Sequence, residues 1–376
     1  MSGRPRLGDF FSNRQEPGRP GLPVMSVTMN DSLVLRDDLD RRTESALRPD
    51  QHLLVRKGDI AYNMMRMWQG ACGLATADGV VSPAYVVLAP KPGIDSRFAY
   101  HWFKSARMIY LFWAYSHGLT DDRLRLYFDE FAEIPIAPPP LTQQRRIATA
   151  LDIFDQAIDQ TANLISARRC RFRSLLNRYA TCFHGERTEF GDLVDLISVR
   201  VQPGARDVPT TSVELENIES ETGRLLGSGN VTSDSALRSK FQSGDTLFGK
   251  LRPYLRKFHR PDFDGICSTE IWVLRTKARK LDPALLYFLV QTPEFDAAAT
   301  KQSGSKMPRA DWDLVSATPI PCPRDLGRQS EVAEILSAAV KSTQIEMHKL
   351  DQLRTQKRAL MQKLLAGDWQ LAGSVK

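Results

Sequence analysis

The chain of 376 residues repeats itself once. Short matches occur in the same order in both halves, at a nearly constant offset of about 185 residues. The matching segments are Leu7–Phe10 with Phe190–Leu193, Gly58–Ile60 with Gly244–Thr246, and Pro135–Ile136 with Pro319–Ile320. Chance matches between the two halves would occur at many different offsets. Because solenoid repeats recur every roughly 20–50 residues, a period this long predicts two whole domains of similar fold.

A proline-rich strip and a long amphipathic segment follow at corresponding places in both halves. The strips are residues 134–140 and 318–323, and proline, which cannot donate a backbone hydrogen bond, predicts extended exits from a globular domain there. Apolar residues then recur at alternating spacings of four and three, the heptad pattern of a coiled-coil seam. We expect Thr142 to cap the first helix. The predicted seam consists of Ile147, Leu151, Phe154, Ile158, Ile165, Phe172 and Leu175 in the first helix, and Val332, Leu336, Leu350, Leu353, Leu360 and Leu364 in the second.

The length of these helices predicts how they pair. At 1.5 Å per residue, a helix over residues 142–178 spans about 55 Å, more than the width of a domain of about 140 residues. Each helix must therefore project, and its apolar stripe needs the matching stripe as a partner. The first helix leads from domain one to domain two, so the pair must be antiparallel. We predict an α+β fold of two similar globular domains, residues 1–141 and 184–327. Two long antiparallel helices, residues 142–183 and 328–376, separate and join them as an intramolecular coiled coil with pseudo-twofold symmetry.

Charge and composition exclude several classes of protein. The 51 Lys and Arg exceed the 44 Asp and Glu, which gives a net charge of +7 and a pI near 9.2 and favours an anionic partner. No segment approaches the ~20 apolar residues of a membrane span, and Met1–Pro5 begins no secretory signal, so we expect a cytoplasmic protein. The five cysteines and six histidines form no C-x-x-C or H-x-x-x-H pair, which argues against disulfides and a metal site.

The predicted symmetry points to duplex DNA. Two equivalent domains held apart by a helix pair, and related by a pseudo-twofold axis, match the local twofold axis of a DNA duplex. The helices would then set the distance between the DNA segments that the two domains read.

These features together resemble the specificity subunit of type I restriction–modification systems. The resemblance rests on Pro138–Ala148, which contains an L-T-x-Q-x-x-I-A type helix start, on its echo in Pro323–Ala333, and on the helix end Lys357–Gly367. Ser303–Lys306, with Asp313–Leu314 and Pro319–Pro321 after it, resembles the end of the target recognition domains of that family. The resemblance covers nearly the whole chain. It departs from the family pattern at the loop Gly118–Asp122 and at the second helix start, Gly327–Glu331.

The resemblance implies a non-catalytic DNA-reading subunit. Each globular domain would be a target recognition domain that reads one half of a bipartite, asymmetric target. Two methyltransferase subunits would dock along the helices and supply S-adenosylmethionine chemistry, in which the adenine is flipped out of the stack. Restriction or translocase subunits would bring ATP and magnesium. This chain itself would hold no cofactor.

Catalytic readings of the sequence are weaker. Gly244–Lys250 mimics a phosphate-binding loop, but Leu251 stands where that loop needs Ser or Thr, so we interpret the stretch as the start of a strand. We predict no catalytic residue. Two alternatives remain open. A two-headed protein-binding scaffold without DNA specificity predicts no salt-dependent affinity for duplex DNA, and an enzyme with an unrecognised motif predicts turnover by the purified chain alone.

Candidate DNA-binding residues are those that combine basic, amide and aromatic side chains near the repeated Gly-Asp turn and near the later glycine loop. Arg and Lys neutralise phosphates, whereas Arg, Lys, Asn and Gln also read base edges. The alternative is that these residues are solvated surface charges. The candidates are Asn63, Arg66, Trp68, Gln69, Arg123 and Arg125 in the first domain, and Lys250, Arg252, Tyr254, Arg256, Lys257, Lys306 and Arg309 in the second.

Overall fold

A computed structural model of the chain describes residues 4–29, 33–38, 47–120, 123–183, 185–231, 236–301 and 307–366. It divides into two compact units: unit 1 comprises residues 1–161 and 349–376, and unit 2 comprises residues 162–348. The sequence predicts domain borders at the helix ends, whereas each unit includes half of each long helix. No helix within the described ranges is both long enough and apolar enough to cross a membrane.

Unit 1 is built on a four-stranded antiparallel sheet of order β1-β8-β5-β6, with β2-β3 and β4-β7 as separate pairs. Its strands are β1 (Phe11–Asn13), β2 (Met25–Val27), β3 (Leu33–Leu35), β4 (Leu53–Val55), β5 (Ile60–Asn63), β6 (Cys72–Leu74), β7 (Gly79–Val81) and β8 (Tyr85–Pro90). Its short helices are α1 (Leu7–Phe10), α2 (Ser96–Phe103), α3 (Ala106–Ala114) and α4 (Phe128–Glu133), with 3-10 turns η1 (Arg36–Asp38), η2 (Pro49–Gln51) and η3 (Met67–Gln69).

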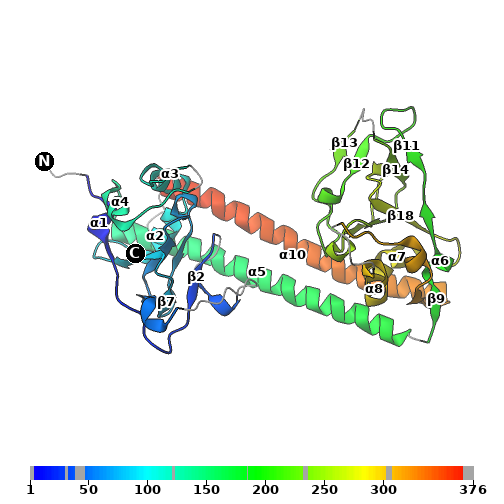
Figure 1. Cartoon of the computed structure of the whole chain (residues 1–376), viewed down its shortest axis with the longest axis horizontal. Coiled ribbons are helices and arrows are strands. Elements are labelled where there is room, and N and C mark those ends of the chain that lie inside the picture. Colours follow the sequence, from blue (N-terminus) through cyan, green and yellow to red (C-terminus); the bar gives the residue numbers. More distant parts are fainter. Residues whose placement is uncertain are drawn as a thin grey trace, which may run out of the picture. The chain divides into compact units, whose positions relative to one another are not determined.

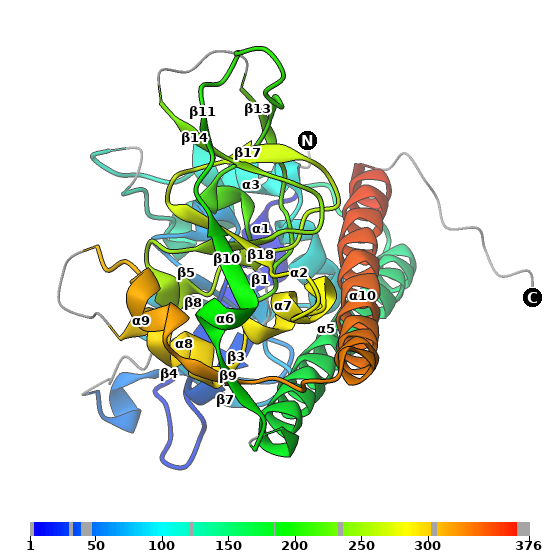
Figure 2. The ribbon, with the colours of Figure 1, turned by 90° about the vertical axis from the view of Figure 1, so that its right-hand side faces the viewer.

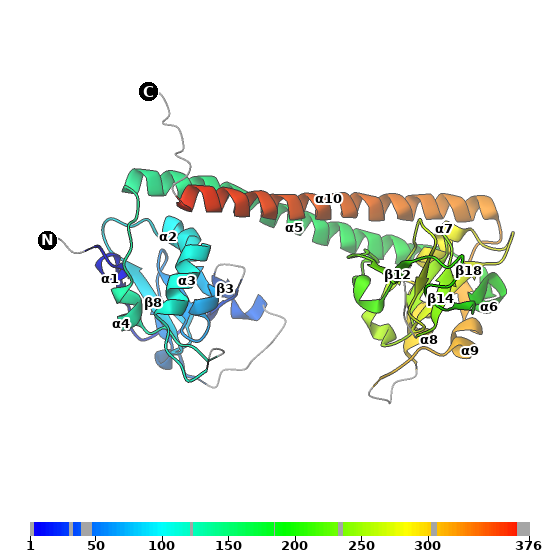
Figure 3. The ribbon, with the colours of Figure 1, turned by 90° about the horizontal axis from the view of Figure 1, so that it is seen from above.

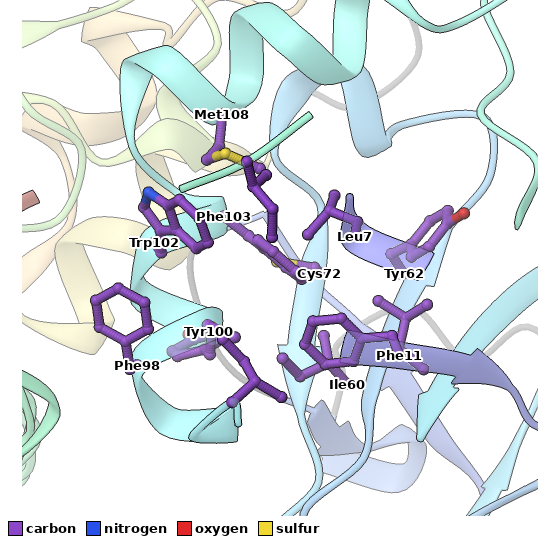
Figure 4. Packing of buried hydrophobic residues seen from close by; sticks show 14 of the residues in the cluster. Leu7, Phe11, Ile60, Tyr62, Cys72, Phe98, Tyr100, Trp102, Phe103 and Met108 are labelled. Carbon is purple, nitrogen blue, oxygen red and sulfur yellow. The ribbon is translucent and has the colours of Figure 1, made fainter. Parts of the chain in front are cut away.

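The core of unit 1 is aromatic. Phe11 from β1, Tyr62 from β5 and Phe103 from α2 are fully or almost fully buried and converge with Ile60 in one cluster (Figure 4). Phe131 of α4 lies within 5.8 Å of Phe103, centroid to centroid, in an edge-on arrangement that aromatic quadrupoles favour. The cluster also includes residues of the two long helices, so it fastens the sheet to them.

Unit 2 contains a four-stranded sheet of order β10-β18-β15-β16, a five-stranded sheet of order β11-β14-β17-β12-β13, and the pair β19-β9. Its strands are β9 (Arg187–Glu189), β10 (Val194–Ile197), β11 (Arg200–Val201), β12 (Thr211–Val213), β13 (Gly229–Asn230), β14 (Arg238–Phe241), β15 (Thr246–Gly249), β16 (Phe258–His259), β17 (Gly265–Cys267), β18 (Ile271–Thr276) and β19 (Pro319–Pro321). Its short helices are α6 (Phe190–Leu193), α7 (Pro283–Leu289), α8 (Pro293–Thr300) and α9 (Trp312–Ser316), with 3-10 turns η4 (Leu215–Asn217) and η5 (Pro253–Leu255). Helix α7 lies between the β10–β18 sheet and the long helices (Figure 2).

The four-stranded sheets of the two units, β1-β8-β5-β6 and β10-β18-β15-β16, repeat one topology. In each, a four-residue helix leads directly into the edge strand of the four-stranded sheet, β1 in unit 1 and β10 in unit 2. The first residue of that helix donates a 3.0 Å backbone hydrogen bond to the proline-rich strip in both cases, from Leu7 to Ile134 and from Phe190 to Thr318. The duplication predicted from the sequence is confirmed.

The two long helices are α5 (Leu141–Cys182), with 42 residues, and α10 (Leu326–Ala366), with 41. Within unit 1, Ile147 and Leu151 of α5 share a core with Leu364 of α10. Within unit 2, Leu176 of α5 shares a core with Leu336 of α10, and Figures 1 and 3 show the two helix halves of this unit side by side. In unit 1, Ile147 shares a core with Leu364, and Asp155, further along α5, pairs with Lys357, which comes earlier in α10. In unit 2, Arg168 pairs with Glu346, and Leu176 shares a core with Leu336. The helix halves of each unit are therefore antiparallel, as predicted. All predicted seam residues are buried or half-buried.

The start of α5 corrects one detail. The helix begins at Leu141, and the backbone N–H groups of Gln143 and Gln144 both bond to Pro140 O, at 2.9 and 3.0 Å. Thr142 therefore lies inside the first turn and is exposed, so its prediction as the N-cap is wrong. Pro140 precedes the helix, and its carbonyl accepts the first backbone hydrogen bonds of the helix.

Candidate nucleic-acid interface

In unit 1 the chain leaves β5 at Asn63 and turns into η3. Asn63 Oδ1 accepts a 2.9 Å hydrogen bond from the N–H of Met65, and the indole N–H of Trp68 donates to Met65 O at 3.0 Å. Arg66 and Gln69 are exposed. Asn63 and Trp68 therefore fix the turn, and the turn presents Arg66 and Gln69 to solvent.

A second candidate segment lies against this turn. The backbone N–H of Leu126 bonds to Met64 O at 3.0 Å, and Arg125 pairs with His117 through two backbone hydrogen bonds of 2.8 and 2.9 Å. The side chains of Arg123 and Arg125 are exposed. The structure thus brings together two groups of predicted residues that lie about 60 positions apart in the sequence.

Unit 2 makes the equivalent arrangement. The N–H of Ala310 bonds to Lys250 O at 2.8 Å, in the position of the bond from Leu126 to Met64, and the N–H of Arg252 bonds to Pro308 O at 2.8 Å. Arg252 is exposed, with a left-handed backbone (φ 52°). Tyr254 is also exposed. In both units, therefore, the segment after the central strand β5 or β15 is paired with a later cationic segment.

Arg309 is already bound to a carboxylate. Its guanidinium donates two hydrogen bonds to Glu270, at 2.9 and 3.1 Å. The bond from Arg309 lowers the pKa of Glu270, against the opposing effect of burial. Glu270 would therefore compete with a DNA phosphate for the guanidinium of Arg309.

Two other candidates bond inside unit 2. Arg256 pairs with Asp296 at 3.3 Å and donates to Gln291 O at 3.0 Å. Lys257 Nζ donates to Leu215 O at 2.6 Å. Their role in DNA binding stays a prediction, but these bonds direct both side chains toward the domain itself.

The two glycine-containing stretches of the second domain differ in whether the structure describes them. Lys306 and the loop Ser303–Lys306 lie outside the described residues. The stretch that mimics a phosphate-binding loop contains β15 (Thr246–Gly249), which pairs with β18 over its whole length. Its interpretation as a strand after a turn is confirmed.

Helix α3 has an exposed aromatic face that was not among the residues predicted from the sequence. Tyr110 and Trp113 are 62% and 47% exposed, and their ring centroids lie 5.9 Å apart. Helix α3 packs against η3, the turn that follows Arg66. The signal in the sequence was the spacing of the two aromatic residues, three positions apart, which places them on one face of a helix.

One cluster in unit 1 has the atoms of a metal site. His101 Nε2 and carboxylate oxygens of Asp152 and Asp155 lie within 4.8 Å of one another. However, Arg97 bonds to Asp152 at 3.0 Å, and Lys357 bonds to Asp155. These cations already neutralise the two carboxylates, so the cluster is built as an ion-pair network that joins α2 to the long helices.

Comparison with known proteins agrees with this architecture. Residues 27–167 match a family model described as the type I restriction modification DNA specificity domain. The type I restriction enzyme EcoDI specificity subunit of Escherichia coli is 30% identical over 147 residues, which is 38% of this chain and 32% of that protein. The match thus spans about a third of the relative's length.

Two solved structures share the fold along nearly the whole chain. The S subunit of the type I system from M. genitalium superposes with a TM-score of 0.60 at 14% identity, and covers 96% of this chain and 95% of its own. A chain from a study of complex assembly and conformational transition of the type I R-M system gives 0.52 at 13% identity, with 98% and 100% covered. The resemblance seen in the sequence is confirmed: residues 27–167 match the model of the type I restriction modification DNA specificity domain, and nearly the whole chain is similar in fold to the solved type I structures.

Proposed function

We propose that this chain is the sequence-specific DNA recognition subunit of a type I restriction–modification complex. Each globular domain reads one half of a bipartite, asymmetric target, and the long helices set the spacing between the halves. The observation that carries the proposal is the repeated topology: both domains pair a segment after the central strand with a later cationic segment, and both end on a long helix. Duplication of one reading module is what a target in two halves requires.

The chemistry of the complex belongs, in this proposal, to its partners. Two methyltransferase subunits dock on the helices and domains and bring S-adenosylmethionine, and restriction or translocase subunits bring ATP and magnesium. The chain itself is non-catalytic and holds no cofactor. It acts in the cytoplasm, where the DNA of the cell is accessible to the complex.

Methylation mapping tests the proposal directly. In cells that carry this chain with its neighbouring methylase gene, sequencing of N6-methyladenine should reveal a split motif, with two specific halves around an unread spacer. Replacing Arg66 by Gln should relax specificity in one half and leave the other unchanged, because Arg66 belongs to one domain. An uninterrupted motif, or a methylation pattern that does not depend on this chain, would contradict the proposal.

Salt-dependent DNA binding tests the interface. Arg252→Gln should weaken duplex binding and reduce the slope of log K against log salt by about 0.9, the loss of one phosphate contact. Glu270→Gln should do the opposite, because it releases Arg309 from its carboxylate partner. Arg171→Gln, at an exposed position of α5, is the control and should leave affinity unchanged. Equal slopes for all four proteins would remove this segment from the interface.

A further inference from the structure

Unit 2 contains a cavity of about 140 Å³ where the long helices meet α7 and the loop of residues 220–224. An apolar cavity of about 150 Å³ accommodates benzene, so the space suffices for one aromatic ring. The cavity is distinct from the interface at Lys250 and Arg252, neither of which lines it.

The walls on one side are apolar and partly aromatic. Phe172 and Leu176 of α5 face Val340 and Met347 of α10, with Tyr287 of α7 beside them. Leu176 is buried, and the other four are half-buried. Such walls suit the face of a planar ring, because burying it removes apolar surface from water.

The remaining walls are strongly cationic. Four arginines line the cavity, and Glu221 is the one acidic residue among the lining side chains. The arginines are Arg169, Arg173, Arg224 and Arg256. Glu221 pairs with Arg173 at 2.6 Å, and Asp296, which does not line the cavity, pairs with Arg256 at 3.3 Å. Arg169 instead contacts the sulfur of Met347, so within the described residues no carboxylate offsets its positive charge. Guanidinium groups bind phosphate and carboxylate in a planar, two-pronged geometry.

The backbone at this place is held in an uncommon conformation. Glu221 and Arg256 both have left-handed φ angles, 63° and 49°. The N–H of Glu221 bonds to Arg256 O at 3.0 Å and ties the two together. Backbone strain of this kind concentrates at ligand-binding positions.

From these walls we propose that the cavity binds a small anion that carries one aromatic ring, as in a nucleoside monophosphate. The ring packs among Phe172, Tyr287 and Met347, and the anionic group binds Arg169, which is exposed and contacts Met347. The bound molecule would contact α5, α10 and the 220–224 loop at once. It would therefore fix the second recognition domain against the helices of its own unit.

Calorimetric titration of the full-length chain tests this proposal with four probes: CMP, cytidine, inorganic phosphate and benzoate. We expect CMP to bind, and cytidine and phosphate each to bind on the order of tenfold more weakly, because each lacks half of the required chemistry. Arg169→Gln should weaken CMP binding by a similar factor. Arg171→Gln, two residues along the same helix and outside the cavity lining, should not change it. Benzoate binding with the same dependence on Arg169 would assign the site to aromatic carboxylates instead of phosphates, within the same class.

Three results would overturn the proposal: cytidine that binds as tightly as CMP, CMP affinity that is indifferent to Arg169→Gln, or no heat with any probe at about 1 mM. Arg169 is exposed, and its guanidinium donates a weak 3.6 Å hydrogen bond to Met347 Sδ, so the variant should fold. DNA binding of Arg169→Gln should match that of the unaltered chain. Failure here therefore leaves the proposed DNA-recognition function standing.

Discussion

Replacing Gln144 by Ala is expected to lower the free energy of unfolding of unit 1 by roughly 3 kcal/mol. Gln144 is 1% exposed. Its Oε1 accepts from the N–H of Asp95 at 2.8 Å, and its Nε2 donates to Gly93 O and Pro139 O at 3.1 and 2.8 Å. Alanine leaves these three backbone groups without their partner in a buried site, which costs more than the hydrogen bonds themselves contribute.

The same device recurs in unit 2. Gln329 is fully buried, accepts from the N–H of Asp282 at 2.7 Å, and donates to Lys280 O and Pro323 O at 3.1 and 2.7 Å. Gln329→Ala should therefore destabilise unit 2 by a similar amount. The repeated glutamine ties the start of each long helix to the proline-rich strip before it and to the loop that enters α2 or α7.

Urea unfolding, with hydrogen exchange to assign the loss to one unit, measures both effects. Thr142→Ala, at an exposed position of the same helical turn, is the control and should change stability by less than about 0.5 kcal/mol. If Gln144→Ala unfolded at the same urea concentration as this control, the three hydrogen bonds would not contribute as described.

The second large effect concerns how each unit holds its long helices. In unit 2 the joint is apolar: Phe172 of α5 and Phe288 of α7 lie 6.1 Å apart, centroid to centroid, with Val340 in the same cluster. The corresponding positions of unit 1 are Lys357 and Asp155, at the offset of 185 that relates the long helices, and His101, at the offset of 187 that aligns the N-caps Asp95 of α2 and Asp282 of α7. There the joint is an ion-pair network, in which His101 bonds to Asp152 at 3.0 Å and Lys357 bonds to Asp155.

Acid is therefore expected to weaken unit 1 at this joint. Burial raises the pKa of Asp152, but the bonds and charges of His101 and Arg97 outweigh burial and lower it below its ordinary value of 3.8. A carboxyl with a lowered pKa stabilises the fold fully above its unfolded pKa, and this stability is lost as the pH falls through the folded pKa. The loss should thus appear below about pH 4. At neutral pH, Asp152→Ala should cost about 2 kcal/mol, because it leaves the buried His101 ring without its partner.

Calorimetric unfolding at pH 7 and pH 3.5 checks this expectation, with unit 2 as the internal control. The triple variant His101→Phe, Asp155→Val and Lys357→Phe copies the apolar joint of unit 2 into unit 1 and should reduce the acid sensitivity of unit 1. Equal acid sensitivity in Asp152→Asn and the unaltered chain would show that this network does not set the pH dependence.

Much of the architecture could be predicted from the sequence because its signals are local and repeated. The alternation of four and three along residues 147–175 and 332–364 is a property of neighbouring turns of one helix. Both helices form, and every predicted seam residue is at least half-buried. The constant offset between the halves predicted two domains of one topology, and both sheets have it. The motif that contains Gln144 was recognised, but its purpose was not, because its partners Gly93 and Asp95 lie far away along the chain.

The sequence by itself thus determined the duplication, the helix pairing and the position of the basic and aromatic candidate segments, since periodicity and composition follow from residues close together in the chain. Only the tertiary structure decided which cations remain available to a ligand. Arg252 is exposed, Arg309 is bound to Glu270, and Arg256 is bound to Asp296, although all three are arginines in similar surroundings in the sequence. The physical reason is that an ion pair forms between groups that the fold brings within about 4 Å, whatever their separation along the chain.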